Sequence, residues 1–339
     1  MKVTDANFPR TADLRVYHLG LRPGEVANRI ITVGSPSRAH RIAAHFDAAP
    51  KPFELTSERG FLTLTGRYKG VPVSVVSIGM GHPNVDFFVR EVRECLSGDM
   101  LIVRLGSCGG LIDVPVGSVV IPKSSVAVER NLDYDFVNPD GCTEQPYRIS
   151  KPVLADEAFH AQVHKSLAAA KPPGGNTVIV AGSVNASADS FYSSQGRQTS
   201  FPDNNEGLIE HLQASVADLA TFEMETFWLY HLAACWSGRK ATSPAAHAPP
   251  LATGPVQPTA SYAPATSAVT AALAGYDTTI RAAAAQMVFA SRTSQDFITP
   301  EQIAVVEEWA GRGILDALAE MRIAPERVHA EEGSVWQLG

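Results

Sequence analysis

The feature that most constrains this chain is the stretch 103–111, VRLGSCGGL, in which an arginine follows an apolar run and precedes paired glycines. Residues 101–103 have the composition of a short buried strand, and the glycines that follow permit a tight, open backbone. Arg104 is therefore expected at the end of a strand, close to a small hydroxyl residue, Ser107. A sheet edge shaped in this way can hold an anion.

A second anion-binding corner is predicted where an apolar strand over residues 29–34 ends. Ser35 can cap a following helix, and Pro36 suits the first helical position. The free amides and the positive end of the helix dipole favour an oxyanion there, with Arg38 nearby. Taken alone, the stretch is interpreted equally well as an ordinary capped helix over residues 36–46 with water-facing arginines.

Side chains suited to a planar heterocycle occur in the stretch 187–197, SADSFYSSQGR. The amide of Gln195 can donate and accept in one plane, and the guanidinium of Arg197 can neutralise charge on a carbonyl oxygen. Phe191 precedes them. Without further context a surface loop is the better interpretation.

Two glutamates bracket a methionine at the start of the stretch 222–235, FEMETFWLYHLAAC. Apolar residues recur at helical spacing after them, so one face of this segment belongs to the core. Burial of Glu223 and Glu225 requires partners, and sugar hydroxyls would serve. Glutamates at a helix start also complement the helix dipole, so a purely structural role is as good an explanation for either one.

Two further cationic side chains and a glycine turn are weaker signals. His18 lies in VYHLGL, and a lone histidine is more often structural or exposed than functional. Arg59 precedes a predicted strand, where an arginine usually faces water. The turn around residues 79–81 is another place where backbone can approach a ligand.

The remaining pattern predicts an alternating α/β arrangement. Strands are expected at residues 61–68, 71–78, 117–121, 125–128 and 177–181 and in the second half of 282–290, and helices at 151–170 and from residues 83 and 299 onward. Lys69 and Gly70 would join two of these strands as a hairpin.

Charge and composition exclude several classes of partner. The formal net charge of −7 and the lack of Lys/Arg runs argue against nucleic acid and an anionic membrane surface, so a small molecule is the expected partner. No apolar stretch approaches the roughly 18 residues of a membrane-spanning helix, and the N-terminus lacks the apolar core of a signal peptide. A cytoplasmic location is expected. The 4 cysteines are too widely spaced to indicate a zinc site or a disulfide framework.

One segment differs in composition from the rest of the chain. Between Lys240 and Asp277 there is no charged Asp, Glu, Lys or Arg, and prolines punctuate an Ala/Ser/Thr background. Such a segment has too few large apolar side chains to repay its ordering entropy. We therefore expect residues 238–279 to be a low-complexity insertion into a single domain formed by residues 1–237 and 280–339.

Five motifs in order, VYHLGL, GSPSR, RLGSCGG, FYSSQGR and FEMET, resemble those of the uridine phosphorylase branch of the nucleoside phosphorylase family. The resemblance covers residues 17–235 and resumes over residues 281–321. It implies an α/β fold, a three-layer α/β/α sandwich whose mixed central sheet is partly barrel-like, and one catalytic domain outside the insertion. It also implies a homo-oligomer built from dimers, in which neighbouring subunits complete each other's sites.

The resemblance assigns roles residue by residue. Phosphate would be bound by Gly34, Arg38, Arg104 and Ser107, and by Arg59 from a neighbouring subunit. The nucleoside would be bound by His18 from the neighbour and by Phe191, Gln195, Arg197, Glu223, Met224 and Glu225, with Arg292 backing the base-reading loop. The expected catalytic residues are Arg197, Gln195 and Glu225.

The implied reaction is reversible phosphorolysis of uridine to uracil and ribose 1-phosphate, in pyrimidine nucleoside salvage, with deoxyuridine and thymidine as further possible substrates. Inorganic phosphate is the co-substrate, and no metal or organic cofactor is needed. Gly60 stands where some bacterial members carry an acidic residue for a monovalent cation, so no cation site is expected. Ser291 stands where purine-cleaving relatives carry an aspartate, which argues against a purine substrate.

Three alternatives to a uridine phosphorylase remain open. A purine nucleoside phosphorylase and a hydrolytic nucleosidase would be other enzymes on the same fold, although a hydrolase has no use for an arginine-lined phosphate corner. A nucleoside-binding protein without activity is the third. The presence of Arg38, Arg104, Arg197 and Glu225 speaks against it.

Overall fold

The computed structural model describes residues 3–236 and 277–338, so most of the predicted insertion lies outside the described residues. The strands are β1 Val3–Thr4, β2 Arg10–Thr11, β3 Arg29–Val33, β4 Phe53–Thr56, β5 Leu62–Tyr68, β6 Val71–Ser77, β7 Met100–Gly110, β8 Val119–Arg130, β9 Tyr147–Ile149, β10 Val153–Leu154, β11 Ile179–Ala188, β12 Leu219–Glu223 and β13 Ile280–Ser291. The helices are α1 Pro36–Ala43, α2 His82–Arg93, α3 Glu157–Ala170, α4 Leu208–Ser215, α5 Thr226–Cys235 and α7 Pro300–Glu320, with short 3₁₀ turns η1 Pro139–Gly141, η2 Ser193–Gln195 and η4 Pro325–Arg327.

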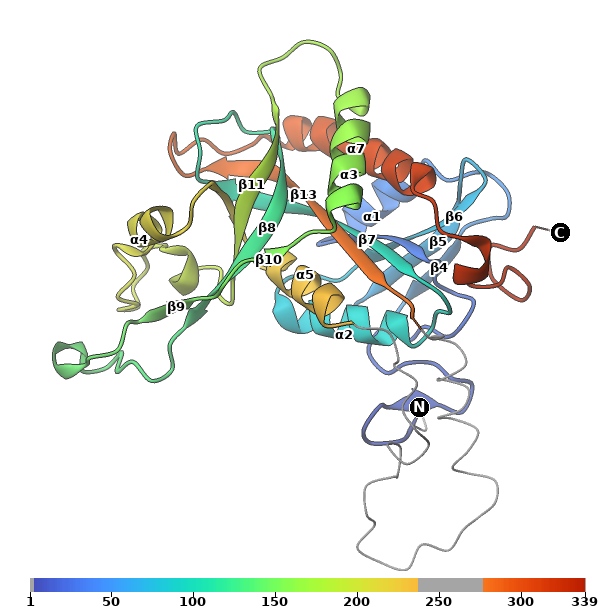
Figure 1. Cartoon of the computed structure of the whole chain (residues 1–339), viewed down its shortest axis with the longest axis horizontal. Helices are drawn as coiled ribbons and strands as arrows, with labels where there is room; N and C mark the ends of the chain where they lie inside the picture. The colour runs from blue at the N-terminus through green and yellow to red at the C-terminus, as the bar shows by residue number, and fades with distance from the viewer. Residues whose placement is uncertain (1–2, 237–276, 339) are drawn as a thin grey trace, which may run out of the picture.

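Within the described residues, a mixed sheet of 11 strands forms the centre of the molecule, with the order β10-β8-β11-β12-β7-β3-β6-β5-β4 (Figure 1). Strand β13 pairs with both β7 and β8, and β9 pairs with β8. The pairings β7–β12, β12–β11, β11–β8, β8–β13 and β13–β7 therefore close a ring. This ring is the barrel-like part of the sheet.

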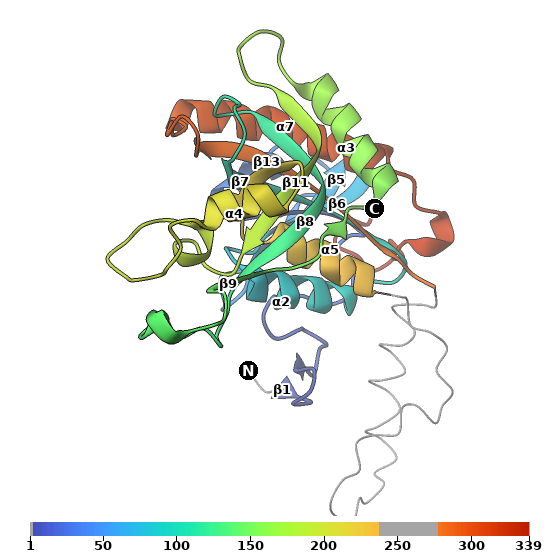
Figure 2. The same ribbon diagram turned by 60° about the vertical axis from the view of Figure 1, so that its left-hand side comes forward.

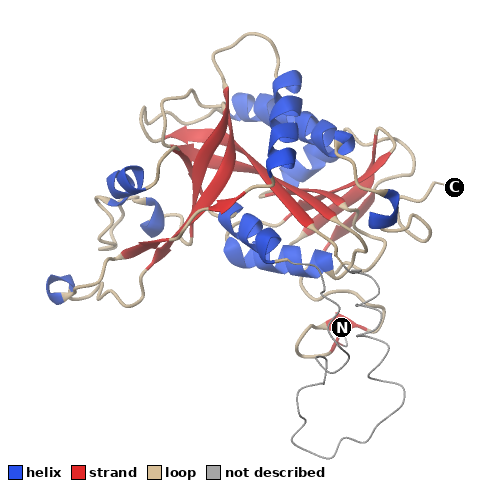
Figure 3. Cartoon of the chain, viewed as in Figure 1, coloured by secondary structure: helices blue, strands red, loops and turns tan. Residues whose placement is uncertain are grey.

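Helices cover both faces of the sheet, as Figure 3 shows in blue around the red strands. On one face, α1, α3 and α7 pack against a core that includes Ile42, Phe159 and Trp309. On the other face, α2 and α5 pack against a core that includes Phe88 and Tyr230. The predicted three-layer α/β/α class with a partly barrel-like sheet is confirmed.

Strand β7 corrects the expectation that the strand stops near residue 103 and leaves Arg104 at its end. The strand continues through the glycines to Gly110, with Arg104 paired to Thr32 of β3 on one side and to Ala284 of β13 on the other. The glycines serve close packing within the sheet. A Cβ on Gly106 would lie 2.5 Å from Oε1 of Gln286 on β13.

Other boundaries also differ from the prediction. The strands expected at 117–121 and 125–128 form one strand, β8, which begins at Val119, and the strand expected at 177–181 begins at Ile179 and continues as β11 to Ala188. The helix expected at 151–170 begins only at Glu157, because Asp156 caps it and β10 precedes it. The strand predicted for only the second half of 282–290 extends over all of Ile280–Ser291 as β13. Its alanines belong to the strand because pairing with two neighbours outweighs the weak strand preference of alanine.

Several predicted elements are confirmed. Strands β5 and β6 form an antiparallel hairpin, and α2 buries the predicted apolar face. Helix α7 begins with a capping box between Thr299 and Gln302. In Figure 1, α4 and β9 lie at the left and β5 and β6 at the right, and the 60° turn of Figure 2 brings α4 and β9 toward the viewer. No helix among the described residues combines the length and apolarity needed to span a bilayer.

Candidate active site

Arg104 is the central side chain of the candidate site. It is 3% exposed, and its Nη2 lies 2.8 Å from Oε2 of Glu225, which follows β12 and is also buried. Among the described residues, neither Nε nor Nη1 of Arg104 has a hydrogen-bond partner. A buried donor without an acceptor is costly, so these two N–H groups are left for an acceptor that the described residues do not supply.

Backbone approaches Arg104 closely from two turns. A Cβ on Gly34, at the end of β3, would lie 3.7 Å from Nη2 of Arg104 and 3.6 Å from the carbonyl oxygen of Gly79. The amide of Gly81, at the start of α2, donates to Oε1 of Glu225 over 2.6 Å. The turn at residues 79–81 thus belongs to the site, together with the end of β3.

Arg38 reaches the same region from the first turn of α1. The hydroxyl of Ser35 caps this helix by accepting from the amide of Arg38, as predicted for this corner. Nη1 of Arg38 donates to the carbonyl oxygen of Leu105 over 3.2 Å, so the guanidinium lies beside the residue that follows Arg104. Burial lowers the pKa of Arg38, while the carboxylate of Glu307, 2.7 Å from Nε, acts in the opposite direction.

The hydroxyl residue of the β7 motif is accessible. Strand β7 is buried along its length except at Ser107, which is exposed and lies in register with Met287 of β13. Next to it, the side chain of Gln286 is fully buried and donates from Nε2 to the hydroxyl of Thr226. Its Oε1 has no partner among the described residues.

The two glutamates differ in their surroundings. Glu223 accepts hydrogen bonds from the side chains of Asn185 and Ser187 and from the amides of Glu225 and Thr226, so it ties the start of α5 to β11. Burial and the charge of Glu225 raise its pKa, and the Ser187 and Asn185 donors oppose this. Met224 between the glutamates is half-buried. Glu223 is thus fully engaged within the chain, whereas Glu225 faces Arg104.

The polar loop after β11 is compact and internally bonded. Nη1 of Arg197 donates to the side-chain oxygen of Gln195 and, over 2.7 Å, to the carbonyl oxygen of Phe191. The guanidinium carbon lies 3.9 Å from the centre of the Phe191 ring. Burial and the neighbouring charge of Arg292 lower the pKa of Arg197 to about 10. Arg197 therefore remains protonated at neutral pH.

Two residues hold this loop in place. Arg292, which follows β13, donates to the carbonyl oxygens of Gln195 and Gly196 over 3.2 and 3.4 Å. The buried amide of Asn205 donates to the carbonyl oxygens of Ser193 and Arg197. Because the backbone amide of Arg292 also donates to the carbonyl oxygen of Gly110 on β7 over 2.8 Å, the loop is linked to the strand that carries Arg104.

His18 and Arg59 form a separate cluster. Nδ1 of His18 lies 2.6 Å from Oε1 of Glu91 on α2, and Arg59 donates to the hydroxyl of Tyr17 over 2.6 Å. Glu91 lies ten residues beyond Gly81, about 15 Å along the helix at 1.5 Å per residue. Within one chain, His18 is therefore bound near the end of α2 that is remote from Gly81 and Glu225, and Arg59 contacts the neighbouring Tyr17.

Some residues of the site were not singled out in the sequence. Glu307 binds Arg38, Glu91 binds His18 and Asn205 holds the polar loop. Their partners are distant in the chain or separated by irregular loop, so no spacing pattern indicates them. Gly81 lies in a glycine turn that the sequence did indicate, but the sequence did not indicate Glu225 as the partner of its amide. In the described part of the chain no group of three or more His, Cys, Asp or Glu side chains could hold a metal ion.

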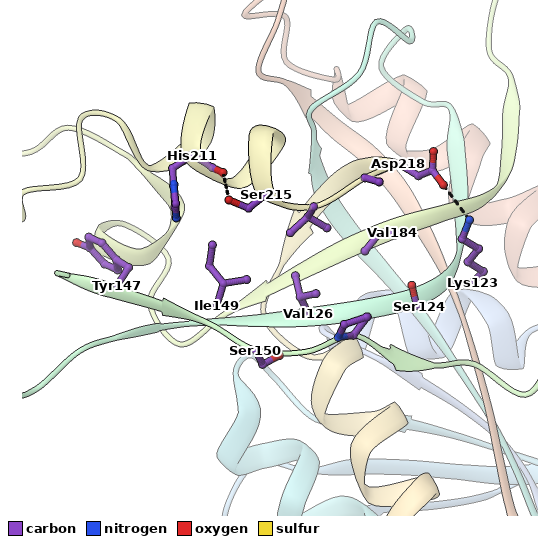
Figure 4. Close-up of a pocket in the computed structure, with 13 residues that line it drawn as sticks. Lys123, Ser124, Val126, Tyr147, Ile149, Ser150, Val184, His211, Ser215 and Asp218 are labelled. Atoms are coloured by element: carbon purple, nitrogen blue, oxygen red, sulfur yellow. Dashed lines mark hydrogen bonds and ion pairs between the residues drawn. The ribbon is translucent and has the colours of Figure 1, made fainter. Parts of the chain in front are cut away.

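A cavity of about 680 Å³ lies elsewhere, between β8, β9 and the start of β12 (Figure 4). Its wall includes Lys123 and Asp218, which form an ion pair of 2.9 Å, and His211 on α4. Val126 and Val184 lie between them. None of the predicted site residues lines this cavity.

The sequence profile of the phosphorylase superfamily matches residues 28–240. The chain belongs to this superfamily. Members of the superfamily similar to it include a uridine phosphorylase of Thermococcus kodakarensis, 32% identical over 68% of this chain and 76% of that protein. A DeoD-type purine nucleoside phosphorylase of Oceanobacillus iheyensis is 31% identical over 67% of this chain and 83% of that protein.

A solved structure is similar to this chain over more residues than the family profile matches. It comes from a study of two diverse uridine phosphorylases in the oomycete Phytophthora capsici, and it is 34% identical to this chain with a TM-score of 0.77. The alignment covers 95% of this chain and 100% of that one. The family resemblance predicted from the five motifs is confirmed. At identities of 31 and 32%, this chain is similar to both purine and uridine phosphorylases.

Proposed function

We propose that this nucleoside phosphorylase is a uridine phosphorylase, which converts uridine and inorganic phosphate to uracil and ribose 1-phosphate. The observation that carries the proposal is the buried guanidinium of Arg104, whose Nε and Nη1 have no acceptor among the described residues. Arg38 adds a second positive charge beside it. Phosphate would accept from both, and from the hydroxyl of Ser107 and the backbone at Gly34.

The sugar would lie against Glu225. In the reaction a phosphate oxygen forms a bond to the anomeric carbon as the bond from that carbon to N1 of uracil breaks, and the bonding pair leaves with uracil, which later takes a proton from water. Positive charge develops on the ribose ring meanwhile. A carboxylate has about four acceptor positions, so Glu225 can accept from sugar hydroxyls while it keeps Arg104 and Gly81 as donors.

The leaving base would be stabilised by the polar loop. Negative charge develops on the uracil carbonyl oxygens, and preorganised donors at that point act like an oxyanion hole. The amide of Gln195 and the remaining N–H groups of Arg197 are such donors, and Arg292 and Asn205 restrain their movement. Phe191 offers an aromatic face to the base, and Met224 an apolar contact to the sugar.

The separate cluster supports a shared site. His18 contacts Glu91, which lies about 15 Å along α2 from Gly81, and Arg59 contacts Tyr17, the residue before His18. We propose that they act in the pocket of a neighbouring subunit, Arg59 on phosphate and His18 on the ribose. Because Glu91 occupies Nδ1 of His18, Nε2 of the imidazole is left for a sugar hydroxyl.

A purine nucleoside is the second candidate substrate, since a purine nucleoside phosphorylase is nearly as similar to this chain as a uridine phosphorylase is. The residue before Arg292 favours the pyrimidine. Ser291 stands there, and its hydroxyl lies 3.0 Å from that of Thr293. A serine cannot supply the acid that the purine-cleaving relatives use to protonate the base.

Base release in the presence and absence of phosphate tests the proposal. The purified protein is incubated with uridine, deoxyuridine, thymidine or inosine, and the free base and the sugar phosphate are measured by chromatography. We expect phosphate-dependent uracil release with ribose 1-phosphate formed in equal amount. Faster release of hypoxanthine would instead indicate the purine enzyme, release without phosphate a nucleosidase, and binding without release a nucleoside-binding protein.

A further inference from the structure

Helix α7 places one buried carboxylate at the proposed phosphate pocket. Oε1 of Glu307 lies 2.7 Å from Nε of Arg38, and both side chains are 6% exposed. Oε2 of the same carboxylate lies 3.6 Å from Nη1 of Arg41, one turn further along α1. Glu307 is 269 residues from Arg38 in the chain and lies outside residues 28–240, which match the family profile.

The contacts of Arg38 divide its guanidinium into two parts. Nε is bound to Glu307, and Nη1 donates to the carbonyl oxygen of Leu105 over 3.2 Å. The ring of Phe289 lies 5.5 Å from the guanidinium carbon. These two contacts, one to α7 and one to β7, fix the plane of the guanidinium. An arginine held by Nε presents its terminal N–H groups in a fixed orientation.

The energetics of a buried ion pair indicate a role beyond packing. Removing two charges from water costs several kcal/mol for each ion, and apolar residues of similar volume often stabilise a fold as well or better. The Arg38–Glu307 pair is better explained if one of the two residues needs its charge to bind a ligand. Arg38 needs its charge if it binds phosphate, and Glu307 would then hold the guanidinium in place.

We propose that Glu307 is a positioning residue that orients Arg38 for phosphate, so that helix α7 completes the phosphate pocket. The inference rests on the proposed function of the pocket. A carboxylate that only joined α1 to α7 would affect stability and leave phosphate affinity unchanged.

The test compares Glu307→Gln with Glu308→Gln, measuring binding of inorganic phosphate by calorimetry and the KM values for phosphate and uridine. Glu308 is the matched control, because it is half-exposed and contacts His45 on the surface. For Glu307→Gln we expect phosphate binding to weaken and the KM for phosphate to rise about tenfold, with the KM for uridine within about twofold of the wild type. Glu308→Gln should match the wild type.

The outcomes separate this inference from the function it rests on. Wild-type phosphate affinity in Glu307→Gln, even with a lower melting temperature, would overturn the positioning role and leave the proposed function intact. A wild-type protein that neither binds phosphate nor cleaves nucleosides would overturn both. If Glu307→Gln does not fold, Glu307→Asp, which keeps the charge on a shorter side chain, takes its place, with the same expected loss of phosphate affinity.

Discussion

At the scale of single residues, the site is defined by the hydrogen bonds that its arginines make and those they leave unmade. Arg104 leaves Nε and Nη1 without partners among the described residues, whereas Arg292 and Arg38 use theirs to hold a loop and a strand. Composition and spacing do not distinguish these cases. The difference lies in the tertiary structure, where some donors meet carbonyl oxygens and others are buried without an acceptor among the described residues.

Arg197→Ala should lower turnover of uridine. Removing a donor that stabilises charge on the leaving base costs about 10²-fold or more in rate, and kcat should fall together with kcat/KM. Steady-state kinetics with uridine and phosphate measure this. Arg90→Ala is the matched control, because Arg90 is exposed and forms an ion pair with Asp86 within the same helix. Near wild-type kinetics in Arg197→Ala would remove this residue from the mechanism.

The sequence identified the side chains that face the pocket better than those that hold them. Arg38 and Arg104 follow or occupy apolar strands in glycine-rich surroundings, and that local pattern suggests an anion corner, with an ordinary capped helix as an equal interpretation around Arg38. Glu307 stands in the middle of an amphipathic helix, where a glutamate is an ordinary residue. Its burial against Arg38 depends on how α1 and α7 cross, and local pattern carries no information about that.

At the scale of elements, β7 shows where the pattern misled. Glycines disfavour strands, so the pattern predicts that the run after residue 103 leaves the sheet. In the structure β7 is paired along its length with β13, and its glycines let the side chains of β13 lie over it. Tertiary packing outweighs local preference there. Boundaries of β5, β6 and α2 were predictable because their turn and cap residues are local signals.

Gly106→Ala tests whether close packing explains the glycines of β7. The new methyl group would stand 2.5 Å from Oε1 of Gln286, which is fully buried and bound to Thr226, so the glutamine must turn away. We expect a loss of about 1–3 kcal/mol in the free energy of unfolding, measured by urea denaturation. Gly141→Ala serves as the control, since a Cβ at that position meets nothing within 4 Å. Equal stability of the two variants would contradict close packing at Gly106.

At the scale of the whole molecule, the residues proposed to act on substrate form two groups on different parts of one chain. The arginine pocket is built from β3, β7 and the start of α5, and the cluster of His18 and Arg59 lies along α2 and the turn before β5. Sequence motifs placed both in one function. We propose that an assembly of at least two chains brings both into one site.

A mixture of two defective chains tests whether sites are shared. Arg59→Ala and Arg104→Lys should each be nearly inactive, because lysine lacks the fork of arginine. In a mixed dimer with shared sites, one pocket carries both substitutions and the other carries neither, so activity returns. Co-expression with two affinity tags, followed by purification of the mixed species and assay of phosphorolysis, measures the recovery. Mixed dimers as inactive as their parents would show that each chain uses its own Arg59.

The closed ring of β7, β12, β11, β8 and β13 leaves these strands no free edge along which to slide or open. We expect amide protons to be best sheltered along the long β7–β13 and β8–β11 pairings, whereas the β7–β12 and β8–β13 pairings that close the ring comprise two residue pairs each. Motion that admits a substrate and lets a product escape is then expected in the glycine turn before α2 rather than in the loop around Arg197, which Arg292 and Asn205 restrain. The architecture thus joins a rigid ring of strands to one adjustable turn.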